Sequence, residues 1–295
     1  MKKILFRISI IAIAVLSLMS CNRDELSPES VIKEEDLIQN DFDKWLYANL
    51  LEPYNIRIQY RFSDTEAEMD YYLSPADYNQ SIALAHLIKA ICIEPYDDVT
   101  NGTDFIRENY PKLLFFSGSP AYTSNGSLLM GSAEGGMKIT LYAVDNLDLD
   151  NITADLEYFK TLHHEFAHIL HHKVPDPTDF NEISGEKYVG DSCWEVYPSD
   201  AAARQAGFIT RYAAFNDKED FVELIAYYVT RSEAVWNSFL ETAGETGAPI
   251  IESKFSIVRT YMQKNWGIDL DKLRTAVLSQ AAKVPEMDLF DITVD

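Results

Sequence analysis

Five of the six histidines in this chain lie within ten residues, in the segment LHHEFAHILHH at positions 162–172. The segment closes a stretch, residues 151–172, that reads as one helix. Asn151 or Thr153 can cap its start, and the KVPDP that follows brings two prolines that stop it. The chain must therefore fold around a helix that carries several imidazoles.

Two of these histidines have the spacing of a metal site. His164 and His168 lie one turn apart on one helix face, so both can bind a single zinc ion. Glu165 lies about 100° round the axis from His164, which keeps its carboxylate off the metal and near a water molecule bound to it. Zinc would acidify that water, and Glu165 would act as general base and pass the proton to a leaving amine. The competing interpretation is a core helix with incidental histidines, although a buried glutamate without a partner is costly.

The remaining histidines of the segment fit less well. His168 and His172 are also four apart, but Ile169 stands where the general base would be. His171 shares a face with His168 and is an alternative ligand, although it lies two turns from His164 and no glycine bends the chain between them.

A catalytic zinc takes three protein ligands and one open position. The best source of the third is EDFVE, residues 219–223, in a predicted helix over 217–230. Glu219 and Glu223 share one face, so one can bind the metal while the other accepts the free ring N–H of a ligand histidine. Asn216 and Glu219 also fit a capping box, which would turn Glu219 away from the metal. Both glutamates stay open as the third ligand, with Glu219 preferred.

The N-terminus has the pattern of a secreted lipoprotein. Three cationic residues precede the apolar run Ile8–Leu18, which predicts a signal peptide over residues 1–20. LMSC resembles the lipobox of bacterial lipoproteins, in which the cysteine, here Cys21, is acylated. Residues 21–36 are polar and read as a tether.

The net charge of -22 makes nucleic acid and anionic headgroups poor partners, so membrane attachment would come from the acyl chains only. Cys92 and Cys193 remain after lipidation. They could pair in an oxidising compartment, or Cys92 could be a buried thiol.

The residues around Glu219 carry a resemblance. Tyr212, seven residues before Glu219, together with EDFVE resembles the glutamate helix of gluzincin peptidases of the lethal-factor type. In those enzymes the first glutamate of E-x-F-x-E binds zinc and the preceding tyrosine stabilises the oxyanion. The resemblance implies Glu219 as the third ligand and Tyr212 as the oxyanion donor.

The likeness extends over nearly the whole mature chain. The lipobox, HEFAHILHH, EDFVE and the closing NWGIDLDKLR are similar to the substrate import-associated zinc metallohydrolase lipoproteins of Gram-negative bacteria. This resemblance implies a zinc metallopeptidase on the outer membrane, facing the periplasm or the cell surface, that accompanies nutrient importers and acts on a peptide or protein. It names no particular substrate.

The order of expected elements gives the fold class, α+β. Helices over 38–51 and 74–93, the second with Ser74 as cap, alternate with strands over 56–62 and 112–118 and with a strand pair over 126–144 that Gly135 and Gly136 interrupt. The resemblance makes this a zincin-like fold, with an α/β lobe over 37–173 that holds a twisted sheet and the H-E-x-x-H helix, and a mainly helical lobe over 174–295.

Two further interpretations stay open. In zincins the strand beside the motif helix pairs with extended peptide, and AEGGMKITLYAV would be that strand, or a simple hairpin. The alternative function is a non-catalytic lipoprotein that binds a nutrient or glycan for an importer, with some of the seventeen tyrosines and four tryptophans as stacking surfaces. Exposed coplanar aromatic rings away from the histidines would favour it.

Overall fold

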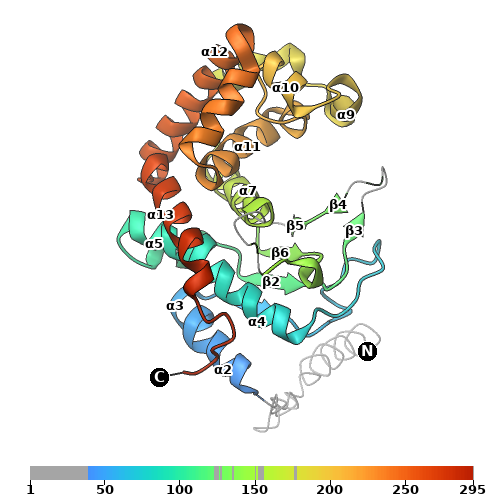
Figure 1. Cartoon of the computed structure of the whole chain (residues 1–295), viewed down its shortest axis with the longest axis vertical. Coiled ribbons are helices and arrows are strands. Elements are labelled where there is room, and N and C mark those ends of the chain that lie inside the picture. The colour runs from blue at the N-terminus through green and yellow to red at the C-terminus, as the bar shows by residue number, and fades with distance from the viewer. Residues whose placement is uncertain are drawn as a thin grey trace, which may run out of the picture. The chain divides into compact units, whose positions relative to one another are not determined.

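A four-stranded sheet of mixed direction forms one layer of the fold (Figure 1). Strands β1, β2 and β6 are parallel, and β5 runs antiparallel to β6 with Gly131 opposite Leu141. In spatial order the strands are β1 (Arg57–Gln59), β2 (Leu113–Phe116), β6 (Lys138–Leu141) and β5 (Gly131–Glu134). Strand β5 is therefore an edge strand. A separate hairpin pairs β3 (Ala121–Tyr122) with β4 (Leu128–Leu129).

The computed structural model describes residues 39–122, 126, 128–134, 136–149, 151, 156–175 and 178–294. Residues Asn40–Asp295 pack as one compact unit, and the expected division at residue 173 stays a prediction. The expected signal peptide, Cys21, the tether, Gly135 and Thr153 lie outside the described residues. In the part of the chain that is described, no helix has the length and apolar character needed to cross a bilayer.

The first helical segment confirms the helix expected near residues 38–51. It runs from α2 (Asp41–Leu46) through the π-helical turn η1 (Tyr47–Leu51) into α3 (Glu52–Tyr54). Asn40 and Asp43 form a capping box, in which each side chain accepts the backbone N–H of the other residue.

The second helical segment begins later than expected. Asp77 is its cap, with the carboxylate accepting the N–H of Gln80, so the expected cap at Ser74 is wrong. Pro75 instead forms an antiparallel bridge with Ser117 just beyond β2, which keeps this stretch extended. The segment comprises α4 (Tyr78–Leu87), η2 (Ile88–Ile93) and α5 (Glu94–Thr100), and α6 (Asp104–Asn109) follows.

Helix α7 (Leu156–Lys173) carries the histidines and lies between the sheet and helix α11 (Asp217–Thr230) (Figure 1). Its apolar side is fixed by aromatic packing, since the ring of Phe166 lies 5.2 Å from that of Tyr96 and 4.8 Å from that of Tyr110. A Cβ at Gly131 would lie 3.0 Å from Thr161 Cγ2, so this glycine permits the close approach of α7 to β5. The opposite face of α7 is thereby presented to α11.

The chain after α7 is mainly helical, as expected. Gly244, at φ 67°, breaks α12 into two helices within this helical part of the chain. The longer elements are α8 (Thr178–Ser184), α9 (Cys193–Val196), α10 (Asp200–Ala206), α12 (Glu233–Trp266) and α13 (Leu270–Lys283). The 3-10 turns are η3 (Val144–Asn146), η4 (Gly185–Lys187), η5 (Gly190–Ser192), η6 (Tyr212–Ala214) and η7 (Val284–Glu286).

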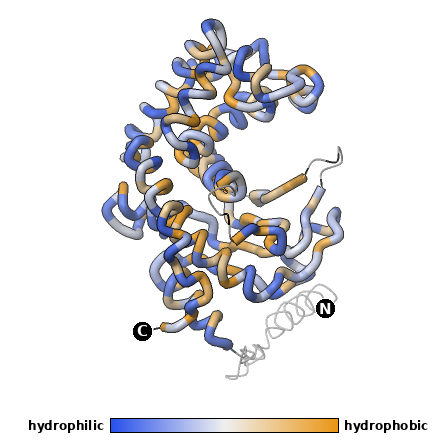
Figure 2. Tube along the Cα trace, viewed as in Figure 1, coloured by the Kyte–Doolittle hydropathy of each residue, from blue (hydrophilic) through white to orange (hydrophobic). Residues whose placement is uncertain are grey.

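The expected α+β class is confirmed, with a small mixed sheet and a largely helical remainder. Buried hydrophobic residues lie in the strands and recur along the helices, and Figure 2 shows hydrophobic and hydrophilic residues interspersed along the helical segments. Cys92 and Cys193 are both buried and free, so they do not pair.

A buried ion pair fixes α11 against α12. Lys254 Nζ lies 2.6 Å from Asp220 Oδ2, and both side chains are fully buried. Tyr188 also donates its hydroxyl to Asp220. Because Asp220 follows Glu219, this pair sets the rotation of α11 about its axis.

Replacing Lys254 with methionine should lower the free energy of unfolding by about 3–5 kcal/mol, because the Asp220 charge would stay buried without its partner. Urea unfolding measures this. Lys44→Met is the matched control, since its pair with Asp41 is exposed (57% and 74%) and should contribute nothing measurable. Equal stability of the two variants would show that the buried pair does not hold α11.

Candidate metal centre

Three side-chain atoms converge between α7 and α11. His164 Nε2, His168 Nε2 and Glu219 Oε2 form a triangle in which each pair is 3.1 Å apart. Two imidazole nitrogens that face each other need a proton or a cation between them. Ligands around a tetrahedral zinc at 2.0–2.1 Å are about 3.3 Å apart. The donor types and the spacing of the triangle therefore fit a zinc ion.

The triangle depends on the antiparallel register of the two helices. Glu219 faces His164 and His168, and Glu223, one turn further along α11, faces His164 and Lys160. Both helices place their polar groups at intervals of four residues, so one register aligns all of these contacts.

The start of α11 decides the question of the capping box. Asn216 caps the helix, with its side-chain oxygen 2.8 Å from the N–H of Glu219. The carboxylate of Glu219 turns to the two imidazoles instead. The cap therefore leaves Glu219 able to bind a metal.

Glu223 orients His164 from behind. Its Oε1 accepts His164 Nδ1–H at 2.8 Å and Lys160 Nζ at 3.0 Å, and its Oε2 accepts the hydroxyl of Thr210 at 2.7 Å. Burial would raise the pKa of Glu223, but Lys160 and His164 hold it well below the usual range. With Nδ1 carrying the proton, Nε2 of His164 is the nitrogen left for a metal.

The carboxylates create a place for positive charge. Burial alone would lower the pKa of His164, but hydrogen bonds to Glu219 and Glu223 raise it to about 9. Burial would raise the pKa of Glu219, but its hydrogen bonds to His164 and His168 lower it to about 2. A metal cation at the triangle would meet the same favourable field.

Glu165 and Tyr212 lie at the same site. Both line the cavity of about 880 Å³ that also contains the triangle. Burial raises the pKa of Glu165, against the effect of the histidines. The ring of Tyr212 lies 6.0 Å from that of His164, and burial with the charge of Glu219 raises the pKa of Tyr212, so its hydroxyl stays protonated. The structure thus places all five expected residues of the site together.

His171 lines the same cavity but has a packing role. Its ring stacks on Phe221 at 5.0 Å and 15°, and lies edge-on to Tyr261. The group of converging donors found among the described residues consists of His164, His168 and Glu219, without His171.

Three neighbours of the site were not expected from the sequence. Lys160 had a detectable signal, because it lies four residues before His164 on the same helix face. No such signal marks Thr210 or Trp194 in the sequence. Both lie in the chain between α8 and α11, and only the course of that chain in the fold brings them to the site. The ring of Trp194 stacks on that of Tyr212, with centroids 6.4 Å apart and planes tilted by 20°. The guanidinium of Arg211 lies 4.7 Å from the centroid of the Trp194 ring.

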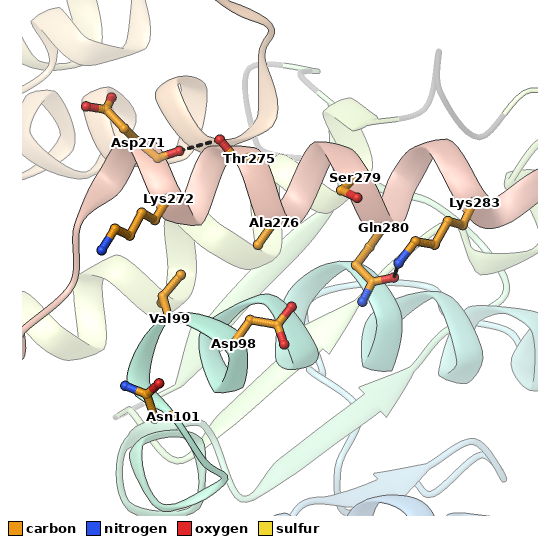
Figure 3. A pocket seen from close by; sticks show the side chains of 10 residues that line it. All are labelled: Asp98, Val99, Asn101, Asp271, Lys272, Thr275, Ala276, Ser279, Gln280 and Lys283. Carbon is orange, nitrogen blue, oxygen red and sulfur yellow. Dashed lines mark hydrogen bonds between the residues drawn. The ribbon is translucent and has the colours of Figure 1, made fainter.

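A second cavity has different chemistry. It has a volume of about 550 Å³ and lies between α5 and α13, lined by Asp98, Asp271, Lys272 and Lys283 among others (Figure 3). Lys283 there donates to Gln280 at 3.3 Å, and no histidine or cysteine is among its lining residues. The metal-binding chemistry is confined to the cavity beside α7 within the described residues.

An H-E-x-x-H helix, a second helix that supplies a glutamate and an edge strand beside the first helix define a zincin-like protein. The chain belongs to the family described as "Putative zinc-binding metallo-peptidase", whose family model matches residues 35–271. A crystal structure of a protein from Bacteroides caccae ATCC 43185, described in the same words, is 37% identical, with a TM-score of 0.75 over 90% of this chain and 100% of that one. Comparison with curated proteins gives no match.

Replacing Glu223 with alanine should weaken zinc binding about 10- to 100-fold, because His164 loses the acceptor that orients it. Competition with a chelating dye measures the affinity, and circular dichroism checks the fold. Thr210→Val is a milder second variant that removes only one donor to Glu223, and Glu241→Ala, exposed on α12, is the control. Unchanged affinity in the Glu223 variant would contradict this role.

Proposed function

We propose that this chain is a zinc-dependent metallopeptidase in which His164, His168 and Glu219 bind one zinc ion. The observation that carries the proposal is the triangle of two imidazole nitrogens and one carboxylate oxygen, each 3.1 Å from the others, with Glu165 beside it. Three protein ligands fit a catalytic zinc, which keeps a further position for water or substrate.

The side chains around the triangle have complementary tasks. Zinc bound there would supply a Lewis acid that brings the pKa of water toward neutrality and polarises a carbonyl. Glu165 takes the proton of the attacking water and hands it to the leaving amine. Tyr212, held protonated, donates a hydrogen bond to the oxyanion that develops at the carbonyl oxygen. Glu223 keeps His164 oriented through Nδ1.

The edge strand supports a peptide or protein as substrate. Ala133 from β5 and Gly136 and Met137 from the following turn line the same cavity as the triangle. Strand β5 pairs with β6 on one side, and an extended peptide can add to the edge of a sheet through main-chain hydrogen bonds. Gly136, at φ 72°, lies in the turn between β5 and β6, so AEGGMKITLYAV spans a hairpin. Its second half, β6, is an interior strand, and the edge left for a peptide is that of β5.

The cellular setting is a further part of the proposal and rests on the sequence. The signal peptide, the lipobox at Cys21 and the polar tether support an outer-membrane lipoprotein that faces the periplasm or the cell surface. The resemblance to import-associated lipoproteins supports a partnership with an outer-membrane importer. Metabolic labelling with palmitate, abolished by Cys21→Ala, tests the anchor.

The alternative of a non-catalytic nutrient- or glycan-binding lipoprotein has less support. It calls for exposed coplanar aromatic rings away from the histidines. In a cavity of about 980 Å³ near α12, the rings of Tyr228, Trp236 and Phe255 are buried and tilted by 41° to 86° to one another. Such rings offer no flat platform for a sugar.

Replacing Glu165 with glutamine should keep the zinc and lower peptide hydrolysis about 10²- to 10⁴-fold, because the amide cannot accept the proton. Terminal labelling of the products from a peptide library measures hydrolysis, and elemental analysis measures zinc. Glu182→Gln, exposed on α8, is the matched control. Unchanged turnover in the Glu165 variant would reject the mechanism.

Replacing Glu219 with alanine should remove most of the zinc from the purified chain, because the third ligand is lost. Normal zinc content in the Glu219 variant would move the third ligand to another residue.

Replacing Tyr212 with phenylalanine should retain full zinc content and lower kcat about 10²- to 10³-fold, since one hydrogen bond to the oxyanion disappears.

A further inference from the structure

A cluster of cations lies near the C-terminal end of α7. Arg107, Lys112 and Lys173, called here the basic cluster, are held by neutral oxygen atoms. The acceptors are the carbonyl oxygens of Glu52 and Pro53 for Arg107, that of Arg107 for Lys112, and that of Glu108 with the amide oxygen of Asn109 for Lys173. Neutral acceptors orient these cations without cancelling their charge.

The basic cluster is exceptional in so acidic a chain, whose net charge is -22. Among the ion pairs of the described residues, none includes a member of the cluster. Its members also repel one another: burial lowers the pKa of Lys112, and the charges of Lys173 and Arg107 lower it further. Positive charge is therefore concentrated here without an internal counter-ion.

The basic cluster borders the cavity of the metal centre. Lys173 lines that cavity, and Lys112 donates its backbone N–H to Met137, another lining residue, at 2.9 Å. Lys218, exposed at the start of α11, lines it as well. Because α11 runs antiparallel to α7, Lys218 lies beside the C-terminal half of α7, toward the same end as Lys173. Two lysines thus line the cavity toward this end of α7.

The charges of Lys173 and Lys218 are not needed inside the site. A zinc ion would be balanced by the carboxylates of Glu219 and Glu165, which leaves the two ammonium groups for an external partner. At long range the acidic surface repels acidic peptides, so their capture requires cations next to the site. Screening in salt confines this attraction to about 8–10 Å, the scale of the cavity.

We infer that this end of the cavity binds a carboxylate of the substrate, and the inference rests on the proposed peptidase function. The carboxylate is either an aspartate or glutamate side chain near the scissile bond or the C-terminal carboxylate of a short peptide. Lys173 and Lys218 bind it, and Arg107 and Lys112 strengthen the local potential.

Peptide binding to the zinc-loaded full chain carrying Glu165→Gln tests this inference without turnover. The probes are labelled heptapeptide pools that differ by Glu or Gln at one position, each made as the free C-terminal acid and as the amide. Fluorescence anisotropy should show the carboxylate-bearing pools binding about fivefold or more tightly than neutral ones, and less so at high salt. A preference between Glu and Gln identifies the side chain, and one between acid and amide identifies the terminus.

The lysines are tested by Lys173→Met, Lys218→Met and the double variant, in the same background. The double variant should lose the preference while binding the neutral pools unchanged. Lys264→Met, exposed on α12, should keep it. Equal binding of all pools, no binding of any pool, or a preference that survives the double substitution overturns the inference.

The outcome separates this inference from the function on which it rests. Hydrolysis of the same pools by the unmodified chain is measured in parallel. Preferred binding of carboxylate-bearing peptides without cleavage would contradict the peptidase function and support the carboxylate-binding site. Cleavage without a preference that depends on the lysines would support the peptidase function and contradict the carboxylate-binding site.

Discussion

Carboxylates of α11 contact both ring nitrogens of His164 within hydrogen-bonding distance, and the rest of the site depends on these two contacts. Glu219 lies 3.1 Å from Nε2 and Glu223 lies 2.8 Å from Nδ1. Since Glu223 accepts a hydrogen bond from Nδ1–H, it fixes the tautomer, and Nε2 faces His168 and Glu219. The aromatic packing of Phe166 positions α7, and the buried pair of Lys254 with Asp220 positions α11. Together they hold the two helices in the register that allows both contacts to His164.

The parts of the site that follow from local spacing could be predicted from the sequence. The four-residue intervals place His164 with His168, and Glu219 with Glu223, each on one helix face. The sequence could not decide which glutamate meets Nε2, because that depends on the register between helices more than fifty residues apart in the chain. Tertiary packing sets this register, and the spacing of residues within each helix does not predict it. Thr210 was hidden for the same reason.

The fold shows the same division between local and long-range signals. The caps at Asn40 and Asn216 and the break at Gly244 are encoded by neighbouring residues, and the helices they bound were predictable. The cap expected at Ser74 failed because Pro75 is engaged by Ser117, a partner more than forty residues away. The close approach of α7 to β5 at Gly131 could not be predicted either, because the need for a glycine there depends on a neighbour from a distant part of the chain.

The two buried thiols of the described residues determine how this part of the chain responds to reductants and oxidants. Cys92 and Cys193 are separate and buried, and burial raises the pKa of each thiol, so thiolate is scarce at neutral pH. No covalent cross-link between them contributes to the fold. Reductants therefore have no bond between these two residues to break, and the buried, protonated thiols react slowly with mild oxidants.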